Sequence, residues 1–188
     1  MRGEAVVCTT DDQQDVIGVV RWSNPMRETP DVDDLPVNAA LITWSGSMSD
    51  DLNEADPRNF MRVGHEAFQE RCVALRDALV AADRMMVFVP SPLHILSDAP
   101  GTRAFQERWS NGPFGILIDP WHLITEDMQD RREEHLERIV ELAGPQAWGM
   151  RIDPAADPAS RSQMLQLWAT HRRSHAVTVE GSVAGLPG

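Results

Sequence analysis

The chain has 188 residues, 42% of them apolar and 24% charged, which is typical of a globular domain long enough to bury a sizeable core. Its net charge of -12 disfavours a nucleic-acid backbone or an anionic membrane surface as a partner. All 17 basic residues are arginine, which excludes a lysine Schiff base and a lysine general base.

The N-terminal sequence MRGEAVVCTTDDQQD is too acidic, and its apolar run too short, for a signal peptide. No stretch approaches the roughly 18 to 20 apolar residues of a membrane span. Cys8 and Cys72 lie far apart without a CxxC spacing, so we expect buried thiols of a reducing compartment. These features predict a cytoplasmic protein.

Short apolar runs recur along the chain, each bounded by polar or turn residues. Several are apolar throughout, which is typical of parallel strands covered on both faces. The predicted strands are EAVVCTT (4–10), VIGVVRW (16–22), NAALITWSG (38–46), RMMVFVP (84–90), FGILID (114–119), AWGMRID (147–153) and AVTVEG (176–181).

Helical periodicity marks three segments between these runs. Residues 56–84 begin with the start signal Asp56-Pro57, residues 130–144 end at a glycine, and residues 160–173 form a shorter third helix. The apolar face of the first helix is predicted to hold Phe60, Gly64, Phe68, Cys72, Leu75, Leu79 and Ala82.

Strands and helices alternate from residue 38 onward, which predicts an α/β fold with a parallel sheet. We expect residues 85–90, 114–119 and 147–152 to be adjacent parallel strands. The proline-rich and acidic segment 23–36 is a predicted loop. The whole chain, 1–188, is predicted to be one domain, with a reduced N-terminal part (1–37), β/α units (38–181) and a tail (182–188).

In parallel α/β folds, functional side chains gather at the carboxyl ends of the strands. Asp119 and His122 follow one predicted strand, three residues apart, and such a pair suits a divalent metal such as zinc, manganese or magnesium. The alternative is that Asp119 caps its own turn before a proline. By themselves, Glu180 reads as a solvated strand-end charge and His94 as a loop histidine.

Tryptophans also fall at strand ends. Trp44 ends one predicted strand and Trp121 follows another, whereas the remaining tryptophans read mostly as core residues. At the end of a sheet, such indole rings could wall a pocket for a sugar ring.

From residue 38 to 181, the order of motifs resembles the C-terminal part of the xylose-isomerase-like TIM-barrel superfamily, which includes sugar-phosphate isomerases and epimerases and AP endonucleases. The segment FGILIDPWHLI (114–124) is similar to the Asp-x-x-His segment of that family, in which both residues bind metal. The final AVTVEG resembles a strand that ends in a metal-binding glutamate. The resemblance therefore implies a (β/α) barrel with Asp119, His122 and Glu180 as metal ligands.

Three positions depart from the family pattern. Pro90 stands where the family has its first glutamate, Met150 where it has a ligand histidine, and Trp44 where it has an earlier histidine. Proline and methionine cannot replace a hard oxygen or an imidazole as a ligand of such a metal. We therefore expect a weak or empty metal site.

The resemblance implies a metal-dependent isomerase or epimerase of a sugar or sugar phosphate, in which a proton moves between adjacent carbons. Glu180 would be one catalytic residue, and His94 or Asp98 would replace the glutamate lost at Pro90. The alternative is a degenerate, non-catalytic barrel that binds a sugar or serves a structural role. We expect little isomerase activity.

The length also departs from the family, because a full barrel of eight strand–helix units needs about 250 residues. Only 37 residues precede the predicted strand at 38–46. The barrel is therefore expected to be shortened at its N-terminal side, and its open edge predicts a homodimer.

Overall fold

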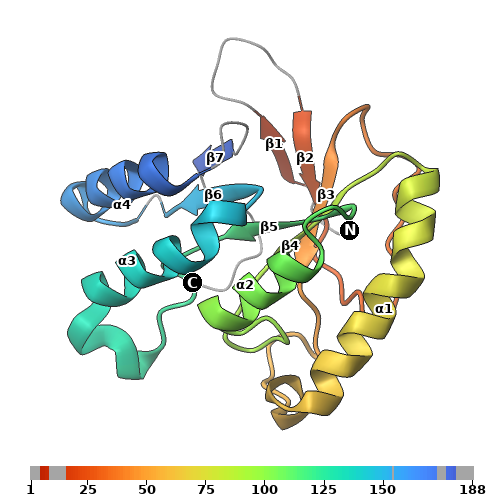
Figure 1. The fold of residues 1–188 in the computed structure, drawn as a ribbon, viewed down its shortest axis with the longest axis horizontal. Helices are drawn as coiled ribbons and strands as arrows, with labels where there is room; N and C mark the ends of the chain where they lie inside the picture. The colour runs from red at the N-terminus through yellow and green to blue at the C-terminus, as the bar shows by residue number, and fades with distance from the viewer. Residues whose placement is uncertain (1–4, 9–15, 154, 173–176, 181–188) are drawn as a thin grey trace.

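A computed structural model describes residues 5–8, 16–153, 155–172 and 177–180 of the chain. Its sheet follows the order of the sequence, with each strand hydrogen-bonded to the next (Figure 1). The strands are β1 (Ala5–Cys8), β2 (Val16–Val20), β3 (Ala40–Trp44), β4 (Met86–Val89), β5 (Phe114–Ile118), β6 (Gly149–Ile152) and β7 (Val177–Glu180).

The six strands from β2 to β7 are parallel and form an open half-barrel. From β3 onward, helices alternate with the strands and follow one another around the outside of the sheet (Figure 1). They are α1 (Arg62–Ala81), α2 (Ala99–Arg108), α3 (Arg132–Ala143) and α4 (Pro158–His171). The predicted α/β fold of a shortened TIM-type barrel is confirmed, as is the adjacent parallel pairing of the strands at 85–90, 114–119 and 147–152.

The parallel sheet begins earlier in the chain than the alternating pattern indicated. β2 already pairs in parallel with β3, through Gly18 and Ala40 among others, so the N-terminal part contributes one barrel strand. β1 instead runs antiparallel to β2. A short hairpin-like pair therefore stands where the resemblance implies further β/α units.

The two faces of the sheet bury different sets of side chains, because successive residues of a strand point to opposite faces. On the outer face, Leu41, Phe88 and Ile116 belong to the main core together with side chains of the helices, such as Phe68. The inner face has a second apolar cluster, which contains Val20, Ile42, Trp44, Val87, Val89, Leu117 and Val179.

Gly115 illustrates how closely the strands approach on the inner face. A Cβ atom placed on Gly115 would lie 2.9 Å from the Cβ of Trp148. Glycine is therefore required where β5 passes the start of β6, because a side chain would force the backbone apart.

The first predicted helix begins later than its apolar spacing indicated. Asp56 accepts a hydrogen bond from the backbone N–H of Arg58, and this cap starts a 3₁₀ turn over Pro57–Phe60. Met61 then has an extended backbone, and α1 starts after it. Phe60 is consequently 49% exposed, so its predicted place on the buried face was wrong. The prediction is confirmed for Gly64, Phe68, Cys72, Leu75 and Leu79, all of which are buried.

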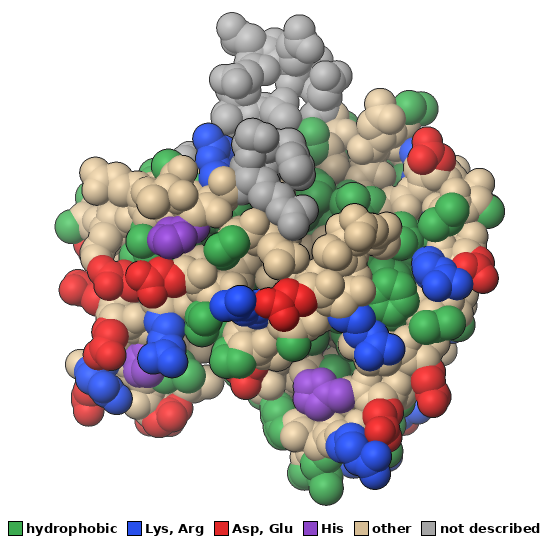
Figure 2. Space-filling model, in the orientation of Figure 1, with side chains coloured by type: hydrophobic (Ala, Val, Ile, Leu, Met, Phe, Trp, Pro, Cys, Tyr) green, Lys and Arg blue, Asp and Glu red, His purple; other side chains and the backbone are tan. Residues whose placement is uncertain are grey.

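Other expectations concern the surface and the thiols. Segment 23–36 has neither helix nor strand, as predicted. Charged side chains are spread over the face that Figure 2 shows, and acidic ones gather over α3. Cys72 is a buried free thiol, whereas the Cys8 side chain lies outside the described residues.

Among the described helices, none has the length and apolarity that a membrane span requires.

Candidate functional site at the carboxyl ends of the strands

Side chains from five neighbouring parallel strands or the residues just after them meet at the carboxyl end of the half-barrel. This end is where parallel α/β folds place functional groups, since the loops after all the strands converge there. The residues are Trp22 after β2, Trp44 at the end of β3, His94 after β4, Asp119 and His122 after β5, and Arg151 in β6.

Asp119 is fully buried and forms an ion pair with Arg151. The pairing of Ile118 with Met150 places the two residues side by side on adjacent strands. One Asp119 oxygen, Oδ2, accepts a hydrogen bond from the Arg151 guanidinium, whose side chain is only 11% exposed. A buried carboxylate requires such a partner, because its desolvation would otherwise cost several kcal/mol.

The second oxygen of Asp119 shapes the loop that follows β5. Its Oδ1 accepts a hydrogen bond from the backbone N–H of His122 at 3.1 Å, and its backbone carbonyl accepts one from Leu123 at 3.2 Å. This arrangement is the turn-capping role that the sequence left open as an alternative to metal binding. Asp119 thus orders the loop and neutralises Arg151 at the same time.

The loop after β4 is held against the turn after β3, and this contact positions His94. Ile95 donates its backbone N–H to the carbonyl of Gly46 at 3.0 Å, and Leu96 donates to the Ser45 hydroxyl at 3.3 Å. Gly46 has a φ of 89°, a left-handed conformation that favours glycine in this turn. The two loops therefore form one connected rim.

His94 is 1% exposed, and its Nε2 lies 3.0 Å from the carbonyl oxygen of Leu52. Because a carbonyl can only accept, Nε2 carries the proton and Nδ1 is left as a bare acceptor. Nδ1 is buried and has no hydrogen-bond partner among the described residues. Burial lowers the pKa of His94 to about 4, so the ring is neutral at pH 7 and a weak proton acceptor.

His122 has a similar environment on the neighbouring loop. Burial lowers its pKa and the nearby Arg151 guanidinium lowers it further, while the Asp119 carboxylate acts in the opposite direction. Its Nε2 is buried without a hydrogen-bond partner in the described part of the chain. The site thus holds two neutral imidazoles, each with one unused ring nitrogen.

Trp44 lies at the centre of this group of rings. Its indole stacks on Trp22 with ring centroids 4.3 Å apart, meets the His94 ring edge-on at 5.0 Å, and lies 5.5 Å from the His122 ring. Trp44 is buried, whereas Trp22 is half-buried. We call Trp22, Trp44, His94 and His122 the aromatic cluster.

The predicted metal ligands are brought together only in part by the described residues. Asp119 and His122 are adjacent, but the metal trio also needs Glu180, whose backbone pairs with Ile152 and whose side chain lies outside the described residues. Within the described residues, no group of three or more His, Cys, Asp or Glu side chains is placed to hold a metal. The convergence of the trio therefore stays a prediction.

Two positions that depart from the family pattern lie in the sheet or directly after one of its strands. Pro90 directly follows β4, and Met150 is fully buried in the main core. Asp98, a predicted substitute for the lost glutamate, caps α2 by accepting the backbone N–H of Gly101 at 2.7 Å.

Sequence reasoning missed Arg151 and Trp22 as members of the site. Arg151 had a usable signal, since a lone arginine inside an otherwise apolar strand requires a buried partner. Trp22 had no such signal, because its stacking on Trp44 depends on the parallel pairing of β2 with β3.

In comparisons with protein-family models, curated proteins and solved structures, no match to this chain was found.

Proposed function

We propose that this chain is a shortened, non-catalytic relative of the xylose-isomerase-like barrels that binds a sugar or sugar phosphate without a metal. The observation that carries the proposal is the ion pair between Arg151 and Asp119. Asp119 is the residue to which the resemblance assigns a metal, and its carboxylate already holds an internal cation.

A divalent ion bound by Asp119 would lie next to a guanidinium in a poorly solvated site. Repulsion between like charges at such separations costs several kcal/mol at an effective dielectric constant of about 20. Methionine at position 150 and proline at position 90 further reduce the number of ligands for an ion. The described residues therefore favour a metal-free state.

The aromatic cluster has features that suit a sugar. Indole faces pack well against the C–H face of a pyranose or furanose ring, and the half-buried Trp22 lies over Trp44 at the carboxyl end of the sheet. The unused ring nitrogens of His94 and His122 would hydrogen-bond to ligand hydroxyls, and both rings are neutral at pH 7. A ligand would thus satisfy buried polar atoms that the described chain leaves unpaired.

Tryptophan fluorescence can test this proposal directly. The protein is first freed of metal with EDTA and then titrated with D-xylose and with D-ribose 5-phosphate. The same titrations are repeated in the presence of millimolar Mn²⁺. We expect saturable quenching with the same Kd in both conditions. Trp22→Leu should weaken binding about fivefold, or about 1 kcal/mol, while the matched variant Trp109→Leu on the outer face should not.

Absence of saturable binding by any sugar tested would contradict the proposal.

The alternative function is a metal-assisted isomerase that uses Asp119, His122 and Glu180 as metal ligands. Glu180 and His94 would then move the proton. The adjacency of Asp119 and His122 favours it. Stoichiometric Mn²⁺ binding together with aldose–ketose interconversion would establish this alternative in place of the metal-free binding protein.

A further inference from the structure

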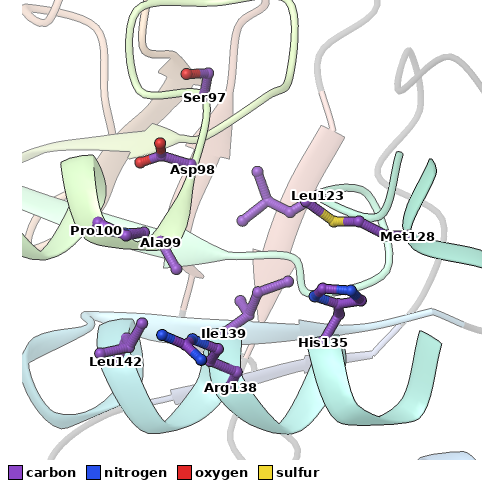
Figure 3. A pocket seen from close by; sticks show the side chains of 10 residues that line it. All are labelled: Ser97, Asp98, Ala99, Pro100, Leu123, Met128, His135, Arg138, Ile139 and Leu142. Carbon is purple, nitrogen blue, oxygen red and sulfur yellow. The ribbon is translucent and has the colours of Figure 1, made fainter. Parts of the chain in front are cut away.

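A cavity of about 150 Å³ lies between the start of α2 and the side of α3 that carries His135, Arg138, Ile139 and Leu142 (Figure 3). The loop that follows β5 closes it on a third side. Its lining residues are Ser97, Asp98, Ala99, Pro100, Leu123, Met128, His135, Arg138, Ile139 and Leu142.

The floor of the cavity is apolar and separate from the main core. Ala99, Leu123 and Ile139 form a small buried cluster of their own, against which Leu142 packs. Their exposed fractions are 6%, 3% and 7%, so the floor consists of side chains that are already packed in place. Such a surface favours an apolar ligand through its removal from water.

Arg138 places a positive charge on one side of the rim. His135 and Arg138 lie one turn apart on α3, and both line the cavity (Figure 3). Arg138 is exposed, and no carboxylate in the described part of the chain forms an ion pair with its guanidinium.

The acidic residue on the opposite side of the cavity is already engaged. Asp98 caps α2, with its carboxylate oxygen 2.7 Å from the backbone nitrogen of Gly101. The positive end of the α2 dipole offsets part of the Asp98 charge. The net charge of the chain acts at longer range, where salt screens it beyond about 8 Å. Among the charged side chains that line the cavity, Arg138 is therefore the one that a bound carboxylate would pair with.

We propose that this cavity binds a small monocarboxylate whose apolar body is about the size of a benzene ring. An enclosed apolar cavity of about 150 Å³ accommodates one benzene-sized molecule. With the apolar body on Leu123 and Ile139, the carboxylate reaches the rim, where the Arg138 guanidinium pairs with it and His135 adds a donor. This site is independent of the aromatic cluster and of the function proposed for it.

The test uses the full chain, labelled with ¹⁵N and titrated with sodium benzoate or with benzyl alcohol, which has the same ring but no charge. We expect benzoate to shift amide resonances around Leu123 and Ile139 and to bind about tenfold more tightly than the alcohol. Arg138→Gln should remove this preference, while Arg132→Gln, an exposed control on the same helix, should keep it. Leu142→Trp should fill the cavity and abolish both binding events.

Equal affinity for benzoate and benzyl alcohol would overturn the assignment of a carboxylate ligand. Unchanged benzoate affinity in Arg138→Gln would show that Arg138 does not pair with the carboxylate. Absence of resonance shifts around the cavity in the unsubstituted protein would overturn the site itself. Arg138 and Arg132 are both exposed, so neither substitution is expected to disturb folding.

Discussion

Arg151 and Asp119, which are 32 residues apart in the chain, meet on adjacent parallel strands as a buried ion pair. Removal of one partner leaves the other charge without compensation. Arg151→Met should therefore lower the free energy of unfolding by about 3 to 5 kcal/mol. The double variant Arg151→Met/Asp119→Asn should recover most of that loss, since asparagine keeps an acceptor for the N–H of His122.

Urea denaturation of the single and double variants measures this coupling. Arg103→Met is the control, because its ion pair with Glu107 is exposed and should cost less than about 1 kcal/mol. Strictly additive effects of the two substitutions would show that the pair is not coupled.

Asn59 should contribute more to stability than its place in a surface turn suggests. It is fully buried, and it donates to the Ser47 hydroxyl at 2.9 Å and to the carbonyl of Leu93 at 2.8 Å. Its Oδ1 accepts the backbone N–H of Met48 at 2.8 Å. Asn59→Ala should lower the free energy of unfolding by about 2 to 3 kcal/mol, because buried partners are left unpaired.

The matched control for this substitution is Asn53→Ala, at an exposed position, which should cost less than about 0.5 kcal/mol. Both changes in unfolding free energy are calculated from the urea midpoints of the variants, with one common dependence of the free energy on urea concentration. A loss of less than about 1 kcal/mol for Asn59→Ala would mean that water replaces the lost hydrogen bonds.

His94 should make stability fall as the pH is lowered from about 6.5 to about 4. Burial holds the pKa of His94 at about 4 in the folded chain, below its ordinary value of 6.5. In this window the unfolded chain binds a proton that the folded chain does not. The stabilisation from the neutral His94 is therefore complete above about pH 6.5 and is lost progressively as the pH falls to about 4. The pKa of His122 is lowered as well, in the same direction.

The predicted loss from His94 alone is at most about 3 to 4 kcal/mol, at 1.36 kcal/mol per pKa unit. Unfolding free energies at pH 6.5, 5.5 and 4.5 should fall less steeply in His94→Phe than in the unsubstituted protein. The control is His65→Phe, which alters a histidine on the outer helix α1. Equal slopes in the unsubstituted protein and His94→Phe would refute the role of His94.

Cys72 should be unreactive in the folded protein. It is fully buried, and burial raises the pKa of its thiol to about 12, which suppresses the thiolate that reacts. In a Cys8→Ser background, a disulfide reagent such as DTNB should modify Cys72 only in denaturing urea. Complete reaction within minutes under native conditions would contradict the buried position of the thiol.

The chain is expected to be a dimer, because β1 and β7 are the two edges of an open sheet. Light scattering at micromolar concentration should give twice the chain mass of 21.0 kDa. A mass of one chain across the concentration range would refute this prediction.

The type and order of most elements could be derived from the sequence because their signals are local, although helical spacing did not mark α2. The apolar run of β5 reflects the burial of its successive side chains. The helical spacing of Phe68, Cys72 and Leu75 reflects the single buried face of α1. The parallel sheet from β3 onward followed from alternation alone, whereas the parallel pairing of β2 with β3 did not. Phe60 was misplaced because a local cap at Asp56 interrupted the helical pattern before α1.

The character of the site depended on tertiary structure. The sequence placed Asp119 and His122 at a strand end, and two chemistries were open to them there. Only the register of β5 and β6 brings Arg151 against Asp119, and only the parallel pairing of β2 and β3 stacks Trp22 on Trp44. A buried charge is compensated by whichever residue the fold places beside it, and separation along the chain does not identify that residue.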